Sequence, residues 1–308
     1  MVTLPFALYD AFSDTAFGGS QAGIVSGAER LDVETRRRVA REIGAPATGF
    51  VTESGDRSIG AQFLSPIAEL PMCGHGTMGL MTRMVEQGVL NWNDGDGIEV
   101  ELRLPSATAA VEISRREDGR PLVMLDVRPP SFREDRLDAE RLGCALGLGK
   151  EDFGQNWPIE TASGDFVHLV VPVRNLAAMR KTDPDFGGLV RFCREHGIET
   201  VALFCTEVER PDHTLHVRDF CPAVGVPESA AAGTTNAALT SYLIRHGIVR
   251  ENGDGRVIVQ AEQGHEIERP SSIRSIVSMN GKSIVRLQVG GVATKVADGQ
   301  LHLPLASR

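Results

Sequence analysis

The chain contains an internal repeat, and a repeat of this length restricts the fold to two halves with the same arrangement of elements. Segment Cys73–Leu90 (CGHGTMGLMTRMVEQGVL) aligns without a gap with Ala232–Val249 (AGTTNAALTSYLIRHGIV). Segment Val39–Val51 (VAREIGAPATGFV) aligns with Phe192–Phe204 (FCREHGIETVALF) at a nearly equal spacing. Because the two aligned pairs occur in the same order along the chain, we expect a duplicated, two-lobed architecture.

Each copy of the repeat has the pattern of a helix, two short strands, a loop and a second helix. The second helix has apolar residues at helical spacing and ends near Gly88 in one copy and Gly247 in the other. Short β-like segments such as SIGAQFL and TLHVRDF surround these helices. The sequence therefore predicts an α+β fold with two pseudo-symmetric lobes, each a β-sheet wrapped around a central helix.

The boundary between the lobes is expected near residue 128. The stretch Arg128–Arg136 (RPPSFREDR) combines a Pro-Pro pair with a run of charges, which is typical of a connection between domains. We therefore predict a first lobe at residues 1–127 and a second lobe at residues 128–289. We expect a C-terminal strand at about residues 290–308 to return to the first lobe.

The charge balance and the missing motifs exclude several classes of protein. Lys and Arg number 32 and Asp and Glu 41, and the net charge of −9 disfavours nucleic acid and anionic lipid surfaces as partners. No window has the roughly 18 consecutive apolar residues of a membrane helix, and the N-terminus lacks a targeting pattern, so we expect a cytoplasmic protein. Five scattered cysteines without CxxC spacing predict neither disulfides nor zinc. Motifs for dinucleotides, phosphate loops and zinc proteases do not occur, so we expect no cofactor and no metal.

The starts of the two repeated helices are suited to binding an anion. Helix N-termini present unpaired backbone N–H groups and the positive end of the helix dipole. If a pseudo-twofold axis relates the lobes, the two starts would face each other across a cleft and bind a small carboxylic acid. The alternative is that the glycines serve only tight turns and close helix packing. The residues expected to bind this substrate are Gly74, Gly76, Ser229, Gly233, Thr234 and Thr235.

Cys73 and His75 are the candidate catalytic residues. Cys73 stands at the first helix start, where the dipole is expected to lower the pKa of the thiol and make the thiolate a base. His75 follows two residues later and would bind a substrate oxygen or donate a proton, although a histidine that only caps the helix would look the same. The other histidines show no metal-ligand spacing, and we expect them on the surface or at helix caps.

Three blocks of the sequence resemble the PhzF family of phenazine biosynthesis-like isomerases. They are DAFSDTAFGGSQAGIV, ELPMCGHGTMG and FCPAVGVPESAAAGTTNAAL, and they span most of the chain in the order found in that family. The resemblance implies the diaminopimelate epimerase-like fold, cofactor-independent proton transfer next to a carboxylate or carbonyl, and a homodimer. The MCGHGT string also resembles the first active-site motif of proline racemases and hydroxyproline epimerases of the same superfamily.

The chain departs from these relatives at several matched positions. Ala232 stands where two-cysteine racemases have their second thiol, which excludes a symmetric two-thiol racemisation on this alignment. Ala47 and Ser229 stand where phenazine-type isomerases have a glutamate and an aspartate. Ser20 occupies a loop position that is usually Asn, and we expect it to contact substrate.

These departures leave Cys73 as the only strong base at the matched positions, and three mechanisms stay open. In the first, Cys73 is the single base and the reaction shifts a double bond. In the second, Cys73 removes a proton while a hydroxyl group leaves the substrate. In the third, a second acid or base acts on the opposite face and the reaction is an epimerisation. The candidates for that second acid or base are Glu69, Glu228 and Ser229, with helix capping or pairing as the structural alternative for the two glutamates. We favour a PhzF-like isomerase of a small acid. The alternatives are a lyase that dehydrates a hydroxy acid or hydroxy amino acid, and a catalytically silent relative that binds a metabolite.

Overall fold

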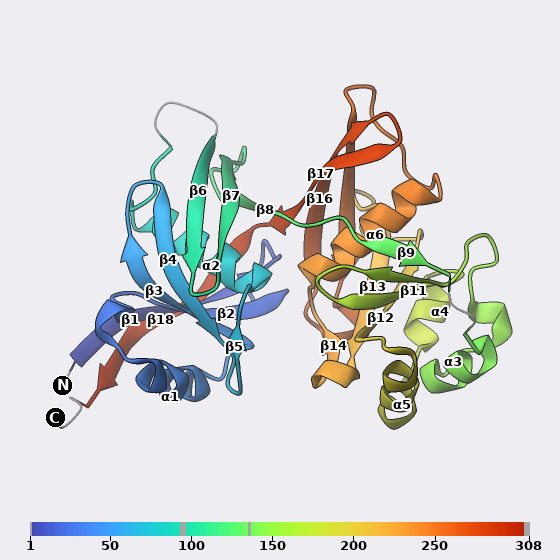
Figure 1. Ribbon diagram of the computed structural model, residues 1–308, viewed down its shortest axis with the longest axis horizontal. Helices are drawn as coiled ribbons and strands as arrows, with labels where there is room; N and C mark the ends of the chain where they lie inside the picture. The colour runs from blue at the N-terminus through green and yellow to red at the C-terminus, as the bar shows by residue number, and fades with distance from the viewer. Residues whose placement is uncertain (1, 93–96, 135–136, 305–308) are drawn as a thin grey trace. The chain divides into compact units, whose positions relative to one another are not determined.

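A computed structural model describes residues 2–92, 97–134 and 137–304 of the chain. The chain forms two compact units (Figure 1). Unit 1 comprises residues 1–126 and 290–308, and unit 2 comprises residues 127–289. The chain thus leaves unit 1 once, builds unit 2 from a continuous segment, and returns to unit 1 for its last strand.

The described residues of unit 1 form a sheet with two α-helices. Its elements in chain order are β1 (Val2–Ala11), β2 (Ser20–Val25), the 3-10 helix η1 (Ala28–Arg30), α1 (Val33–Ile43), β3 (Ala47–Ser54), β4 (Ser58–Leu64), β5 (Glu69–Leu70), α2 (Gly74–Glu86), β6 (Gly97–Leu104), β7 (Ala107–Arg115), β8 (Pro121–Asp126) and β18 (Ala293–Leu303). The last strand, β18, pairs antiparallel with β1.

Unit 2 has a similar sheet and four α-helices among its described residues. Its elements are β9 (Ser131–Arg133), α3 (Ala139–Leu146), η2 (Lys150–Asp152), β10 (Glu160–Ser163), β11 (Val167–Pro172), α4 (Leu176–Lys181), α5 (Phe186–His196), β12 (Thr200–Cys205), β13 (Leu215–Cys221), η3 (Pro222–Val224), β14 (Val226–Ser229), α6 (Gly233–Arg245), β15 (Arg256–Gln263), η4 (His265–Ile267), β16 (Ser271–Asn280) and most of β17 (Ser283–Gly291). Strand β9 falls inside the segment that the sequence suggested as a plain linker.

The two sheets repeat the same pattern of strand pairing. In unit 1, β2 is parallel to β3, β3 antiparallel to β4, β4 parallel to β6, and β6 antiparallel to β7. In unit 2, β11, β12, β13, β15 and β16 follow one another in the same alternation. The predicted order of helix, strand, strand and helix occurs twice, as α1–β3–β4–α2 and α5–β12–β13–α6. The predicted duplication and α+β fold are therefore confirmed.

The repeated glycines end the repeated helices. Gly44 and Gly197 cap α1 and α5 with φ of 71° and 64°. Gly88 and Gly247 follow α2 and α6 with φ of 69° and 65°. A left-handed residue at this position lets the backbone satisfy the last carbonyl groups of a helix, and glycine adopts it at little cost.

One helix of each unit is enclosed by its sheet. Helix α2 contacts β1, β2, β3, β8 and β18, and its residues from Gly76 to Met84 are buried. Helix α6 contacts β11 and β16, and its residues from Thr235 to Leu243 are buried. The opposite faces are covered by α1 in unit 1 and by α3, α4 and α5 in unit 2. Central helices so deeply buried hold the residues at their first turns in fixed positions.

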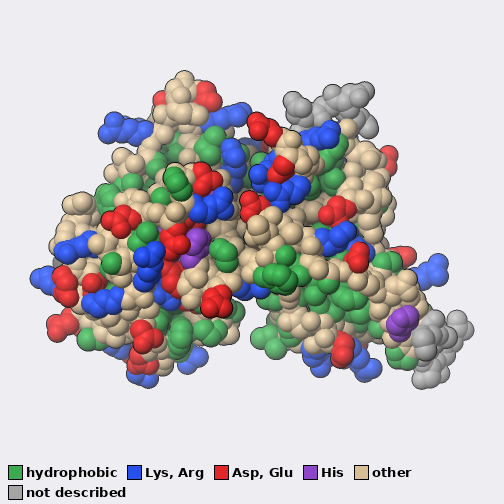
Figure 2. Space-filling model, turned by 180° about the vertical axis from the view of Figure 1, so that it is seen from behind, with side chains coloured by type: hydrophobic (Ala, Val, Ile, Leu, Met, Phe, Trp, Pro, Cys, Tyr) green, Lys and Arg blue, Asp and Glu red, His purple; other side chains and the backbone are tan. Residues whose placement is uncertain are grey.

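Two properties of the surface bear on function. Within the described part of the chain, no helix is long and apolar enough to cross a membrane. The face shown in Figure 2 mixes acidic and basic side chains, so no large patch of one sign covers it.

Candidate active site

The start of α2 brings three of the predicted residues together. Cys73 is the N-cap residue, with extended backbone, and is 5% exposed. Gly74 and His75 form the start of the first turn and are half-buried, and Gly76 is buried. The Sγ atom of Cys73 lies 3.6 Å from Nδ1 and 3.6 Å from Nε2 of His75, so the thiol is in contact with the imidazole ring.

Both members of this pair are neutral near pH 7. Burial raises the pKa of the Cys73 thiol to about 12, and the N–H of Gly76 opposes this rise only in part. Burial lowers the pKa of His75 to about 4. The expectation that the helix dipole lowers the pKa of the Cys73 thiol is therefore wrong, because the loss of solvent outweighs the dipole. The resting pair is a thiol that holds a proton beside an imidazole that lacks one.

Gly76 is required for the packing of this turn. A Cβ atom added there would lie 2.8 Å from two ring carbons of Phe63 and 3.1 Å from Sγ of Cys73. Phe63 is fully buried on β4, so its ring has little room to move. The glycine thus lets the helix start approach the sheet and leaves the thiol in place.

Replacing Gly76 by alanine is expected to lower stability by about 1–3 kcal/mol, because overpacking outweighs the better helix propensity of alanine. Gly74→Ala is the matched control, since nothing lies within 4 Å of its added Cβ. Thermal unfolding measures both variants. Equal melting temperatures for the two variants would contradict the packing role of Gly76.

The start of α6 in unit 2 has a different arrangement. Ala232 is its N-cap residue, and Gly233 and Thr234 are half-buried at the first turn. Thr235 is 1% exposed, and its hydroxyl donates to Oδ2 of Asp219 at 2.8 Å. The side chain of Thr235 is thus turned into the unit, whereas substrate binding by Gly233 and Thr234 stays a prediction.

Sequence reasoning missed Asp219 and placed His168 on the surface or at a cap. Both are buried on the face of the unit 2 sheet that packs against α6, at 1% and 2% exposure. Nδ1 of His168 lies 2.7 Å from the Thr200 hydroxyl and 3.4 Å from that of Thr235. The only sequence signal was a pair of charges inside an apolar strand, Arg218 and Asp219, which predicts buried polar contacts when both faces of a strand are covered.

The candidate second acid or base groups take different positions. Glu228 is buried, and both of its oxygens accept hydrogen bonds from Arg218, at 2.9 and 2.8 Å. Such a bidentate pair fixes a carboxylate and favours a structural role. Glu69 is exposed on β5, and Ser229 is half-buried on β14, directly opposite Asp219. Ser20 is half-buried at the first residue of β2, and its contact with substrate stays a prediction.

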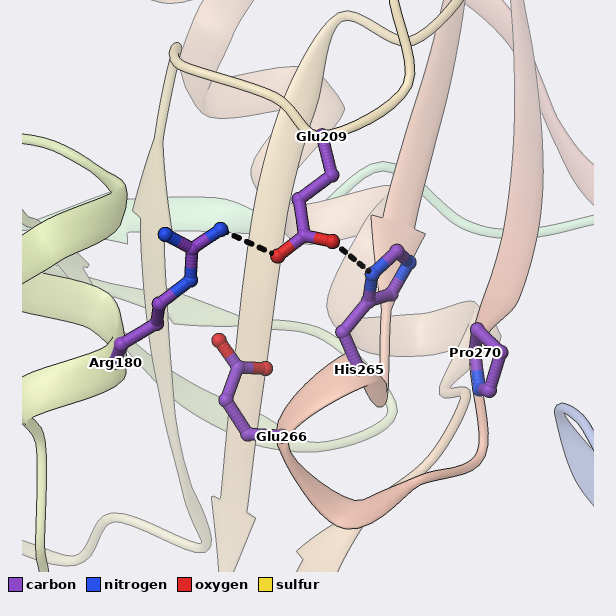
Figure 3. Close-up of a pocket in the computed structure, with 5 residues that line it drawn as sticks. All are labelled: Arg180, Glu209, His265, Glu266 and Pro270. Carbon is purple, nitrogen blue, oxygen red and sulfur yellow. Dashed lines mark hydrogen bonds and ion pairs between the residues drawn. The ribbon is translucent and has the colours of Figure 1, made fainter.

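A pocket on the other face of the unit 2 sheet contains none of these residues. It has a volume of about 330 Å³ and is lined by Arg180, Glu209, His265, Glu266 and Pro270 (Figure 3). Figure 3 shows Glu209 between Arg180 and His265, which donate to its two oxygens at 2.8 and 3.2 Å. These charges are largely paired with one another. The helix starts, not this pocket, therefore hold the candidate chemistry.

Comparisons with known proteins identify relatives along nearly the whole chain. An uncharacterized isomerase of Bacillus subtilis is 27% identical over 273 residues, which are 88% of this chain and 89% of that protein. The trans-2,3-dihydro-3-hydroxyanthranilate isomerase of Pseudomonas aeruginosa is 28% identical over 302 residues, covering 97% and 99% of the two chains. The crystal structure of a Bacillus anthracis phenazine biosynthesis protein of the PhzF family is similar with a TM-score of 0.88 and 24% identity, covering 98% of this chain and 100% of that chain.

The duplicated sheet-and-helix fold and these relatives define the class of protein as an isomerase of the diaminopimelate epimerase-like fold. More narrowly, the chain belongs to the phenazine biosynthesis-like protein family, PhzC-PhzF, whose sequence model matches residues 9–299. The resemblance inferred from the three sequence blocks is thereby confirmed.

Proposed function

We propose that the protein is a cofactor-independent isomerase that moves a proton next to the carboxylate or carbonyl of a small acid, with Cys73 and His75 as the proton-transfer pair. The observation that carries this proposal is the contact of the Cys73 thiol with both nitrogens of His75 at 3.6 Å, at the start of a buried helix. A thiol beside an imidazole is a pair that gives and takes protons without any other group.

The protonation states of the pair assign a role to each member. His75 is neutral and accepts the proton that leaves the substrate carbon, while the electron pair of the broken C–H bond moves into an enolate. The Cys73 thiol then gives its proton to a second carbon, and the enolate becomes the isomerised acid. The imidazolium finally returns its proton to the Cys73 thiolate across the 3.6 Å contact. Cys73 is thus first an acid and only then a base.

The helix starts supply the remaining requirement, which is stabilisation of negative charge. An enolate next to a carboxylate is the costly species in such a reaction, and fixed donors aimed at developing charge lower its energy. The first-turn N–H groups at Gly74 and His75 are such donors at the start of α2. Gly233 and Thr234, at the start of α6, stay predicted binding residues for the substrate carboxylate.

Deuterium incorporation from heavy water tests this function directly. The wild-type protein is incubated with a panel of small acids that includes trans-2,3-dihydro-3-hydroxyanthranilate, the compound named for the Pseudomonas relative. Mass spectrometry is expected to find deuterium in one acid and a product of unchanged composition. Loss of one water from the acid would instead identify a lyase. Binding without exchange would identify a silent metabolite-binding protein.

The proposal also includes a homodimer in the cytoplasm, the assembly and place expected for a PhzF-like enzyme. Light scattering on the purified chain tests the assembly, with a mass of twice 33.2 kDa as the expected result. A monomer over the concentration range of the activity assay would contradict it.

A further inference from the structure

Asp219 is a buried carboxylate that the proton-transfer pair does not use. It lies on β13 with 1% of its surface exposed. Its Oδ2 accepts from the Thr235 hydroxyl at 2.8 Å, whereas its Oδ1 is buried without a hydrogen-bond partner among the described residues. Burying an ionisable group with an unsatisfied oxygen costs stability, so such a group is retained where its charge serves another purpose.

The contacts of Asp219 lead to the first turn of α6. Thr235 is the third residue of that helix, so its hydroxyl connects the carboxylate to the turn that contains Gly233 and Thr234. The Thr235 hydroxyl also lies 3.4 Å from Nδ1 of His168. His168 and Thr234 in turn line a cavity of about 10 Å³ within unit 2, which is space for about one water molecule.

We infer that Asp219 is a positioning residue, which in its charged form holds the Thr235 hydroxyl and thereby fixes the first turn of α6 for binding the substrate carboxylate. A charged acceptor makes a stronger hydrogen bond than a neutral one, so protonation of Asp219 loosens this turn. The kinetic part of this inference rests on the proposed function, whereas the titration of Asp219 does not.

Asp219 is the group expected to titrate near neutral pH in its cluster, which also contains His168, Cys221 and Glu228. Burial raises the pKa of Asp219 to about 6, and the hydrogen bond from the Thr235 hydroxyl lowers it only in part. Burial lowers the pKa of His168 on β11 to about 4 and raises that of the Cys221 thiol on β13 above its usual range. Glu228 on β14 forms an ion pair with Arg218. Proton uptake near pH 6 in this cluster is therefore expected at Asp219.

A direct titration is the first arm of the test, because it needs no substrate. The ¹³C chemical shifts of the aspartate side-chain carboxyl carbons (Cγ) are followed with pH in wild type and in Asp219→Asn. The signal that is missing in the variant belongs to Asp219. One carboxyl group is expected to titrate near pH 6 and to be missing in the variant. A midpoint above about 8 would leave Asp219 uncharged at neutral pH and would overturn the inference whether or not the enzyme is active. A midpoint at or below about 4, the value of an ordinary aspartate, would overturn its pH dependence.

The second arm measures KM and kcat for the acid that exchanges deuterium. In wild type, KM is expected to rise about tenfold as pH falls from 7.5 to 5, with a smaller change in kcat. Asp219→Asn is expected to have the high KM at both pH values, because the amide resembles the protonated acid. Thr235→Ser keeps the hydroxyl and should restore the wild-type profile, whereas Thr235→Val should not. A wild-type KM profile in Asp219→Asn would overturn the inference and leave the proposed function intact.

Discussion

Replacing Cys73 by serine is expected to slow proton transfer by about 10²–10⁴-fold, the range that a positioned acid or base contributes to an enzymatic rate. The serine hydroxyl fits the space of the thiol but is a much weaker acid, so it does not protonate the enolate. The substitution removes the thiol that lies 3.6 Å from both nitrogens of His75. Formation of the isomer that carries deuterium at the second carbon gives the rate for wild type and variant.

Cys144→Ser is the matched control for this experiment. Cys144 is exposed, unlike the four other cysteines, which are buried. Cys144→Ser also replaces a thiol sulfur by a hydroxyl oxygen, but outside the candidate site. We therefore expect the wild-type rate for this variant. Full activity in Cys73→Ser would remove the thiol from the mechanism, and equal losses in both variants would point to a general effect of cysteine removal.

The fold could be predicted because the repeat consists of local sequence patterns, namely helical spacing of apolar residues and glycines at helix ends. The aligned glycines Gly44 and Gly197 occupy the same left-handed position after α1 and α5. The aligned segments that begin at Gly74 and Gly233 become two buried central helices. Amphipathic spacing and helix stops depend on neighbours within a few residues, so one sequence is enough to show them.

The electrostatics of the site could not be predicted in the same way. The position of Cys73 at a helix start was visible, but the degree of its burial depends on Phe63 and the sheet, which tertiary packing brings to it. Asp219 was missed because its partner Thr235 lies on another element, 16 residues further along the chain. Desolvation and hydrogen bonds across a sheet decide a pKa, and neither leaves a periodic pattern.

His216 shows the same limit, since the sequence suggested a surface or cap histidine. Its side chain is fully buried on β13. Nδ1 lies 2.8 Å from Oε1 of Glu262, and Nε2 lies 2.9 Å from Oε1 of Glu266. Burial alone would lower the pKa of His216, but the two carboxylates outweigh it and raise the pKa to about 9. The histidine is thus a buried cation between two anions.

Replacing His216 by leucine is expected to destabilise the protein by about 3–5 kcal/mol, because it leaves two buried carboxylates without their shared counter-charge. In a chain of this size, such a loss lowers the melting temperature by roughly 5–8 °C. Calorimetry or circular dichroism measures the change. His302→Leu is the control, since His302 is exposed on β18 and we expect its loss to change stability little.

The pH dependence gives the sign of the His216 contribution. Its folded-state pKa of about 9 lies above the ordinary value of 6.5, so the stabilisation is complete below about pH 6.5 and is lost as pH rises through 9. The stability difference between wild type and His216→Leu should therefore shrink between pH 6.5 and 9. Adding Glu262→Gln and Glu266→Gln to the leucine variant removes the unpaired charges and should recover part of the loss. A loss that is independent of pH and not recovered in the triple variant would mean that packing, not charge, accounts for the role of His216.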